Sequence, residues 1–442
     1  MRSSDDHRST FAIDVDTGAY AQARRSLREG RLPEPDAVRI EEFVNALTYA
    51  YPEPDGTTPF SVSVEGAPNP FVPGHQILRV GLRGRQVHED RRPVHLTFLV
   101  DTSCSMTPAD RLPLAKHAIE VAVDHLGPRD TVAITTYAGS TEVVLEATPA
   151  ASTRVISAAV ARLHNEGGTA MADGMALAYQ LAWNAFVEGD ENRVVVLSDG
   201  DANIGADSPE AILDQLSVHA RNGVTLSTVG FGTGNYRDAM MEQLADQGDG
   251  NYAYVDTADE AERLFGETLL STVQTIARDV KVQVAFDPHA VRSYRLVGYE
   301  NRDVADDDFR DDHVDGGEIG AGHTVTALYD VVLADAPSGE LATVSLRYAP
   351  PGTGGSAREI AVGLPAGALQ PSFAAASGDL RLAFGMAAFA EKLRGDDATA
   401  AIGWEAILRV VDGAPHAGGR DDELAELIRR AAELSASALA RE

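Results

Sequence analysis

The stretch Val94-His-Leu-Thr-Phe-Leu-Val100 is followed at once by Asp101-Thr-Ser103-Cys-Ser105. The apolar run is typical of a buried strand, and the polar residues after it predict a turn into a helix. One carboxylate and two hydroxyls therefore lie on a single turn. Oxygen ligands of this kind suit a hard cation such as Mg²⁺, which favours octahedral oxygen coordination. On its own the pattern is not specific, because Ser and Asp also favour turns and helix starts.

Two later turns carry further oxygen ligands. Gly167-Gly168-Thr169 precedes a helical stretch, and Ser198-Asp199-Gly200 follows an apolar run. Three turns of this kind are hard to obtain by chance, so the sequence predicts that they meet in one site. Thr169 and Asp199 are the ligand candidates here. The rim that a partner would contact is assigned to Met106, Gly168, Asp201 and Asn203.

Between Val94 and about Thr272, continuous apolar strands alternate with helical stretches. This alternation indicates a doubly wound, mostly parallel sheet. Strands are expected at 94–100, 131–137, 142–146, 193–198, 224–231 and 251–255, and helices at 111–126, 152–163, 172–187, 208–221, 237–247 and 258–276. Ligands of such sheets bind at the carboxyl ends of the strands, which is where Asp101 and Asp199 fall.

Segments on either side of this region alternate apolar and polar residues with period two, which indicates antiparallel strands. Because an isolated hairpin is only marginally stable, we expect residues 60–84 to pair with residues 278–362 in one sandwich, with the α/β region inserted between them. The predicted parts are an N-terminal strand and helix extension (1–59), β strands that join the later β module (60–90), the α/β domain with the metal site (91–277), the antiparallel β module (278–365) and a helical C-terminal region (366–442).

Composition narrows the function classes. The net charge of −30 argues against nucleic acid as a partner, because phosphate binding needs a basic surface. The single cysteine, Cys104, allows no intrachain disulfide. No apolar run approaches the roughly 18 residues that cross a bilayer, and the first residues do not resemble a signal peptide. We therefore expect no membrane span in this sequence.

Asp101-x-Ser103-x-Ser105, then Thr169, then Asp199 resemble the metal-ion-dependent adhesion site of bacterial von Willebrand factor type A (VWA) domain proteins. Other stretches resemble the YfbK-like subfamily, and they are Val38-Arg-Ile-Glu-Glu-Phe-Val-Asn, Asn235-Tyr-Arg-Asp-Ala-Met-Met-Glu-Gln-Leu-Ala, Gly250-Asn-Tyr-Ala-Tyr and Arg295-Leu-Val-Gly-Tyr-Glu-Asn. The resemblance implies an α/β fold: a doubly wound, Rossmann-like VWA domain flanked by an antiparallel β-sandwich module and terminal helices. It also implies a lipoprotein-like location in the cell envelope, with the cytoplasm as the alternative.

Carried over position by position, the resemblance assigns direct Mg²⁺ coordination to Ser103 and Ser105. Thr169 would bind directly or through a water, and Asp101 and Asp199 would act largely through waters. The remaining coordination position would accept a Glu or Asp carboxylate of a partner protein. Mn²⁺ and Ca²⁺ are alternative ions. Neutral hydroxyl ligands leave the ion with net positive character, which suits the capture of a carboxylate.

Three features invite other interpretations. The subfamily usually has Gly where this chain has Cys104, which would be strained if the position required a positive φ. We expect the site to survive, with Cys104 as a small buried apolar filler rather than a redox group. Asp14 and Asp16 look like a second metal turn, and the acidic stretch 306–318 looks like a calcium loop. Structural roles are favoured for both.

An enzyme is the main rival class. The chain has no Gly-x-x-x-x-Gly-Lys-Ser/Thr loop, no His-Glu-x-x-His motif and no Gly-x-Ser-x-Gly elbow. A Mg²⁺-dependent hydrolase usually needs anionic ligands and a base, which two Ser and one Thr do not supply. We therefore expect a non-enzymatic, metal-dependent protein-interaction module. A structural assembly module with a vestigial metal site is the alternative.

Overall fold

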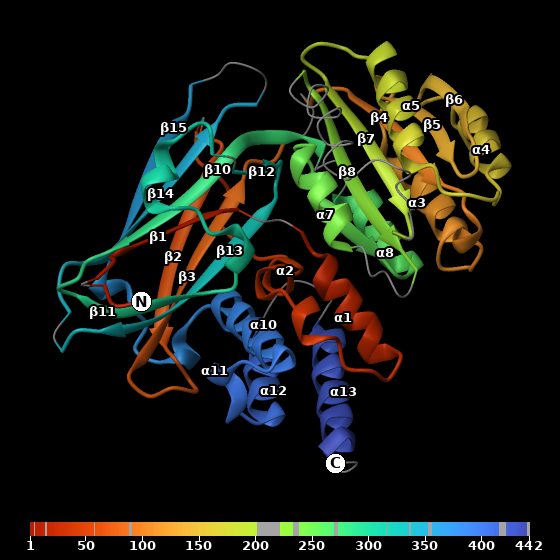
Figure 1. The fold of residues 1–442 in the computed structure, drawn as a ribbon. Coiled ribbons are helices and arrows are strands. Elements are labelled where there is room, and N and C mark those ends of the chain that lie inside the picture. Colours follow the sequence, from red (N-terminus) through yellow and green to blue (C-terminus); the bar gives the residue numbers. More distant parts are fainter. Residues whose placement is uncertain are drawn as a thin grey trace. The chain divides into compact units, whose positions relative to one another are not determined.

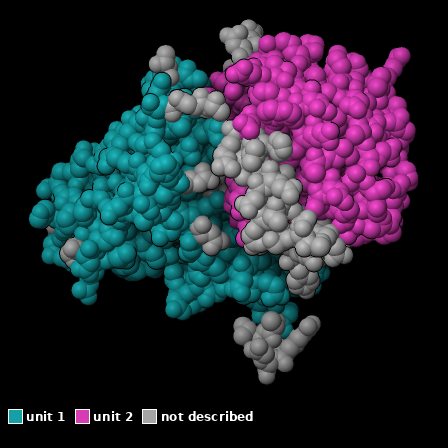
Figure 2. Space-filling view, turned by 45° about the horizontal axis from the view of Figure 1, so that its top comes forward, with its two compact units in different colours: residues 1–85, 277–350, 356–442 teal, residues 86–276, 351–355 magenta. Residues whose placement is uncertain are grey.

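The chain forms two compact units in the computed structural model, which are coloured separately in Figure 2. Unit 1 comprises residues 1–85, 277–350 and 356–442, and unit 2 comprises residues 86–276 and 351–355. The structure describes residues 1–3, 5–13, 16–56, 58–87, 91–200, 222–232, 238–268, 273–314, 316–335, 337–351, 356–414 and 421–439. The predicted helix at 208–221 lies outside these residues.

Unit 2 contains a six-stranded sheet in the order β6-β5-β4-β7-β8-β9. The strands are β4 (Val94–Asp101), β5 (Thr131–Tyr137), β6 (Thr141–Pro149), β7 (Glu191–Ser198), β8 (Val224–Phe231) and β9 (Tyr252–Val255). All neighbouring pairs are parallel except β5 and β6. When the strands are numbered within unit 2, this is the doubly wound order 3-2-1-4-5-6. Successive strands are added on one side of β4 up to β6 and on its other side from β7 onward, so the strand order reverses between β4 and β7. The predicted fold class is confirmed.

Helices cover both faces of this sheet (Figure 1). They are α3 (Leu112–His125), α4 (Thr153–Arg162), α5 (Met171–Asn184), α7 (Asp238–Gln247) and α8 (Ala258–Glu262). Alternate residues of β4 point to opposite faces: Phe98 and Val100 join the core with α3, α4 and α8, whereas Leu99 lies against Gly174 of α5. Both faces are therefore largely apolar, which explains why most residues from Val94 to Val100 are hydrophobic.

The predicted helix at 258–276 runs too far at its end, where the structure has a strand, and residues 269–272 lie outside the described part of the chain. After α8 the chain continues as a π-helix, η3 (Arg263–Thr268), and strand β10 (Thr275–Phe286) has already begun at Thr275. An apolar pattern does not separate i→i+4 from i→i+5 hydrogen bonding, and π segments are rare. Strand pairing with β14 (Glu340–Ala349) holds the residues from Arg278 onward.

Unit 1 holds two antiparallel sheets. One has the order β1-β10-β14-β15 with β12 paired to β10, and the other has the order β11-β13-β3-β2. The remaining strands are β1 (Arg8–Ala12), β2 (Phe60–Pro68), β3 (His75–Gly84), β11 (Val291–Val297), β12 (Gly317–Gly320), β13 (Thr324–Leu333) and β15 (Arg358–Pro365). The register of β3 on β13 places Val80 opposite Ala327. The predicted pairing of residues 60–84 with residues 278–362 is thus found.

Aromatic side chains join the two sheets of unit 1. Phe286 of β10 contacts Tyr329 of β13 edge-on at 5.3 Å between ring centroids, and Phe60 of β2 contacts Tyr348 of β14 at 5.1 Å. These contacts bridge strands of different sheets, as in a sandwich, and edge-to-face geometry is favourable for aromatic pairs.

The α-helices of unit 1 in the described part of the chain are α1 (Gly18–Arg28), α2 (Ile40–Asn45), α10 (Gly378–Arg394), α11 (Asp397–Ala400), α12 (Trp404–Asp412) and α13 (Asp421–Leu439). Helix α10 is buried nearly all round and is capped at its N-terminus by Ser377, whose hydroxyl accepts the Leu380 N–H. Phe389 of α10 packs edge-on against Phe43 of α2. In the described part of the chain, every helix is too short or too polar to cross a membrane.

Candidate metal centre

Asp101 is the last residue of β4 and is fully buried. Its Oδ1 accepts the Ser103 N–H at 2.8 Å, which bends the chain into the short 3₁₀ turn Cys104–Met106. The turn brings Oγ of Ser103 and Oγ of Ser105 to 2.8 Å from each other. The first motif thus places two hydroxyl oxygens side by side above the end of β4.

The second carboxylate oxygen of Asp101 joins three strand ends. Oδ2 accepts hydrogen bonds from Tyr137 OH at 3.0 Å and from Ser198 Oγ at 2.9 Å, and Tyr137 OH also lies 3.0 Å from Ser198 Oγ. Tyr137 ends β5 and Ser198 ends β7, the strands on either side of β4. One buried carboxylate therefore joins the ends of β4, β5 and β7 by hydrogen bonds, at the point where the strand order reverses.

Burial raises the pKa of the Asp101 carboxyl; hydrogen bonds from Ser103 and Ser198 oppose the rise, and the negative charge of Asp199 adds to it. Burial also raises the pKa of Tyr137 well above its usual value, with the charge of Asp101 as the next cause. A cation beside the Asp101 carboxylate would relieve the cost of holding it ionised.

Arg111 already supplies one positive charge. Its Nη1 forms an ion pair with Oδ2 of Asp199 and donates to the Ser105 carbonyl oxygen at 2.7 Å. Room for this side chain comes from Gly232, where a Cβ would lie 2.3 Å from Arg111 Nε. The sequence analysis did not assign Arg111 to the site. The signal that could have indicated it is a basic residue directly before α3, six positions after Ser105.

The loop that carries Thr169 runs beside the motif. Glu166 N–H donates to the Thr102 carbonyl oxygen at 2.6 Å, and Asn165 Nδ2 donates to the Ser103 carbonyl oxygen at 2.9 Å. Gly168 has a φ of +93°, and a Cβ there would lie 2.5 Å from Gly139 Cα. Only glycine tolerates both conditions. Gly168 is exposed, as a rim residue must be, and Thr169 follows it, one residue before the N-cap of α5, Ala170.

Two predictions about the motif loop are wrong. Met106, assigned to the rim, is fully buried in the core of unit 2, because the 3₁₀ turn folds its side chain back under the loop. Cys104, expected as a buried filler, is exposed, and its Sγ lies 3.5 Å from the Glu166 carbonyl oxygen. Cys104 lies in a 3₁₀ helix and is not among the described non-glycine residues with a positive φ. The backbone strain that a positive φ would impose on a cysteine is therefore absent at this position. Asp201 and Asn203 lie outside the described residues.

Three aspartates from the two acidic stretches of unit 1 have protein partners. Asp16 is buried and pairs with Arg302 at 3.4 Å, while Asp306 accepts the Thr10 hydroxyl at 2.6 Å. Asp312 pairs with Arg347 at 2.5 Å. Asp14 lies outside the described residues. Among the residues that are described, no three His, Cys, Asp or Glu side chains are arranged to hold a metal ion.

Comparisons with known proteins agree with this architecture. The model of the von Willebrand factor type A domain matches residues 95–267. A von Willebrand factor model matches residues 1–79, and the model of the C-terminal region of the uncharacterized protein YfbK matches residues 271–339 and 334–434. Uncharacterized protein YfbK of Escherichia coli K12 is 37% identical over 427 residues, which cover 90% of this chain and 73% of the relative.

Two further matches are more distant. Uncharacterized protein sll0103 of Synechocystis is 28% identical over 42% of this chain and 44% of its own length. A solved von Willebrand factor type A structure from Catenulispora acidiphila has a TM-score of 0.47 and 19% identity, covering 83% of this chain and 88% of that one.

A doubly wound sheet with Asp-x-Ser-x-Ser at its reversal point defines the class of VWA-domain proteins, and unit 2 is such a domain. Within that class the chain belongs to the YfbK family, because the match to the Escherichia coli protein extends over both units.

Proposed function

We propose that the VWA domain holds a divalent cation, Mg²⁺ in the first place, and that the ion captures a carboxylate of a protein partner. Mn²⁺ and Ca²⁺ are the alternative ions. The metal would be held by Ser103 and Ser105 directly, by Thr169 directly or through water, and by Asp101 and Asp199 through waters. VWA domains mediate protein interactions, which supports the class of function.

The observation that carries the proposal is the distance between the two hydroxyls. Octahedral Mg²⁺ binds oxygen at about 2.0–2.1 Å, so adjacent ligands lie about 2.9 Å apart. Oγ of Ser103 and Oγ of Ser105 are 2.8 Å apart. The hydrogen-bonded pair therefore matches one edge of a Mg²⁺ coordination sphere. Equatorial ligands around a seven-coordinate Ca²⁺ lie about as close, so the distance fits both ions.

The surrounding charges fit a role in carboxylate capture. Both oxygens of Asp101 already accept hydrogen bonds from the protein, which fixes the carboxylate behind the hydroxyls. One oxygen of Asp199 is engaged by Arg111. The donors nearest the ion are then neutral, so the ion keeps the charge that attracts an anionic partner. This arrangement supports a non-enzymatic interaction module rather than a hydrolase.

Calorimetry with metal-stripped protein tests the metal. Mg²⁺ and Mn²⁺ are titrated separately into wild type and into the Ser103→Ala/Ser105→Ala double variant. Ser140→Ala, which removes an exposed hydroxyl from the same end of unit 2, is the control. Saturable one-site binding in wild type and the control, absent from the double variant, is expected. Absence of binding in folded wild type would favour the assembly module with a vestigial site.

Partner capture needs a second measurement. A displayed library of peptides, with an Asp or Glu fixed at the centre, is selected on immobilised protein in Mg²⁺ and eluted with chelator. Peptides that bind wild type and lose binding on Asp→Asn or Glu→Gln replacement are expected. Selected peptides that bind equally well in chelator would contradict capture through the metal even if the ion itself binds.

A further inference from the structure

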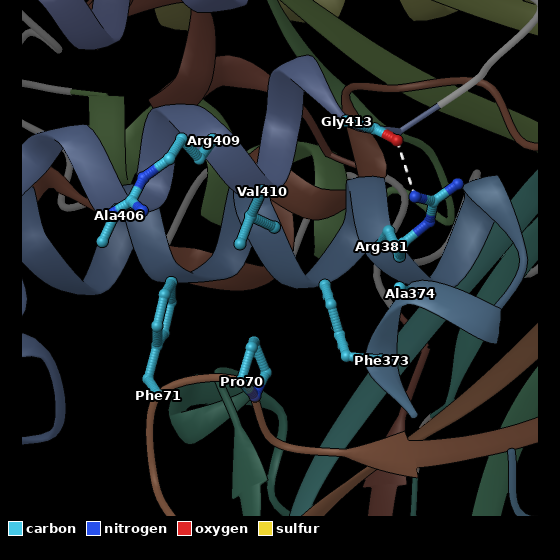
Figure 3. A pocket seen from close by; sticks show the side chains of 9 residues that line it. All are labelled: Pro70, Phe71, Phe373, Ala374, Arg381, Ala406, Arg409, Val410 and Gly413. Atoms are coloured by element: carbon cyan, nitrogen blue, oxygen red, sulfur yellow. Dashed lines mark hydrogen bonds between the residues drawn. The ribbon is translucent and has the colours of Figure 1, made fainter. Parts of the chain in front are cut away.

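A cavity of about 340 Å³ lies in unit 1, between the turn joining β2 to β3 and helix α12. Pro70 and Phe71 line it from the turn and Phe373 lines it from the segment before α10. Figure 3 shows these rings pointing toward Ala406 and Val410 on α12. The cavity is separate from the Asp101 site, since all of its lining residues belong to unit 1.

The apolar wall of this cavity is fixed by aromatic packing. Phe71 lies 5.3 Å and Phe373 5.4 Å from the ring centroid of Phe384, a residue of α10. Each ring is therefore supported from behind by the same buried side chain. A preformed aromatic surface loses little entropy when a second flat group packs against it.

Two arginines flank the apolar wall. Arg381 Nη1 donates to the Gly413 carbonyl oxygen at 2.6 Å, as drawn in Figure 3, and Arg409 Nε donates to the Glu405 carbonyl oxygen at 3.2 Å. Both side chains are thus positioned by neutral carbonyl groups. No ion pair of either arginine is found in the described part of the chain, and the cavity lining contains no carboxylate. In a chain with a net charge of −30, the lining of this cavity thus carries two basic side chains and no acidic one.

From this combination we infer a binding site for a small organic anion: a compound with one flat apolar ring system and a carboxylate. The ring would lie against Phe71 and Phe373, and the carboxylate would reach Arg381 or Arg409, whose guanidinium groups suit carboxylate geometry. The volume is at the lower end of the range for small-molecule sites, which favours a compound of this size over a helix or strand that would need a longer groove.

The probe for this site is 2-naphthoate, titrated into the full-length protein and followed by ligand-observed NMR. A first ligand of this size is expected to bind with a Kd on the order of 1 mM. The neutral analogue 2-naphthylmethanol is expected to bind at least about tenfold more weakly, because it cannot pair with a guanidinium. Thermal unfolding of every variant checks that the protein remains folded.

Variants locate the site. Arg409→Gln and Arg381→Gln are each expected to weaken naphthoate binding at least about fivefold, and Ala406→Leu to abolish it by filling the cavity. Arg429→Gln on α13 makes the same charge change at an exposed position outside the cavity, and should leave the Kd unchanged. Equal binding of naphthoate to all variants, or of the neutral analogue to wild type, would overturn the inference. Tighter binding of an acidic peptide with a central Phe than of naphthoate would assign the cavity to peptide docking instead.

Discussion

Unit 1 and unit 2 both place aspartates in the turns beside their strands, yet the two sets have different surroundings. In unit 2, β4 and β7 are parallel neighbours, so Asp101, which ends β4, and Asp199, which follows β7, lie at the same edge of the sheet. In unit 1 the strands are antiparallel, and Asp306 and Asp312 instead meet Thr10 and Arg347. Convergence of strand ends, rather than the number of acidic groups, is therefore what separates the candidate metal centre from an acidic loop.

The largest difference between the units is expected in Mn²⁺ affinity when one aspartate is replaced in each unit. Asp101→Ala frees the Ser103 N–H and leaves Tyr137 and Ser198 without their acceptor, so the two hydroxyls lose their common orientation. We expect the Kd for Mn²⁺ to rise on the order of 100-fold in calorimetry. Asp306→Ala is the matched change in unit 1 and should alter the Kd by less than about twofold. A similar loss in both variants would remove the distinction between the units.

Asp130 tests whether Mn²⁺ binding depends on where an aspartate lies within unit 2. It lies at the opposite edge of the sheet from Asp101, next to the first residue of β5, and accepts the Val94 N–H at 2.9 Å and the Gly127 N–H at 2.6 Å. Burial would raise the pKa of Asp130, but hydrogen bonds from Arg91 and the main chain outweigh it, and the pKa is lowered. Asp130→Asn is expected to cost about 2 kcal/mol of stability at pH 7 and to leave Mn²⁺ binding unchanged.

The pH dependence of that variant has a definite sign. A carboxyl whose pKa is lower in the folded state stabilises fully above its unfolded pKa of about 3.9, and this contribution is lost as pH falls through the folded value. The stability difference between wild type and Asp130→Asn should therefore shrink below about pH 4. Urea unfolding at pH 7, 5 and 3.5 measures it. A difference that stays constant to pH 3.5 would contradict the ion-pair role of Asp130.

Arg111 and Arg347 give the next comparison, because each pairs with an aspartate of its own unit. Arg111 competes with a metal ion for Asp199 and repels it by charge. Arg111→Gln is expected to lower the Kd for Mn²⁺ about tenfold, whereas Arg347→Gln should leave it unchanged. Weaker Mn²⁺ binding in Arg111→Gln would show instead that the arginine is needed to position Asp199.

The smallest effect is expected from two buried tyrosines. Tyr137 OH donates to Asp101, and Tyr329 OH lies 3.1 Å from the Ser9 hydroxyl in unit 1. Tyr137→Phe and Tyr329→Phe should each cost about 1 kcal/mol in thermal or urea unfolding. Only Tyr137→Phe should also weaken Mn²⁺ binding, by about fivefold. Equal Mn²⁺ affinity in both variants would separate the tyrosine from the metal centre.

Local pattern was sufficient to predict most of the elements. The strands predicted at 131–137 and 224–231 have those bounds in the structure, since an apolar run ended by polar residues is read directly from the sequence. The same reasoning placed Asp101 and Asp199 at strand ends. It did not distinguish α-helix from π-helix at 263–268 or place the start of β10 at Thr275, since both depend on contacts with distant residues.

The parts of the site that were missed depend on long-range contacts. Arg111 meets Asp199 across 88 positions of sequence, and Tyr137 meets Asp101 across 36. Neither pair leaves a periodic signal. The exposure of Cys104 and the burial of Met106 were also reversed, because the direction of each side chain depends on the pitch of one 3₁₀ turn.

The most direct test of convergence at the reversal point is a crystal structure of the protein with Mn²⁺, with the ion located by its anomalous scattering. One strong peak is predicted beside Oγ of Ser103 and Oγ of Ser105, bonded to both, at the carboxyl ends of β4 and β7. A peak in the acidic stretch 306–312 of unit 1, with none at Ser103 and Ser105 under saturating Mn²⁺, would contradict it.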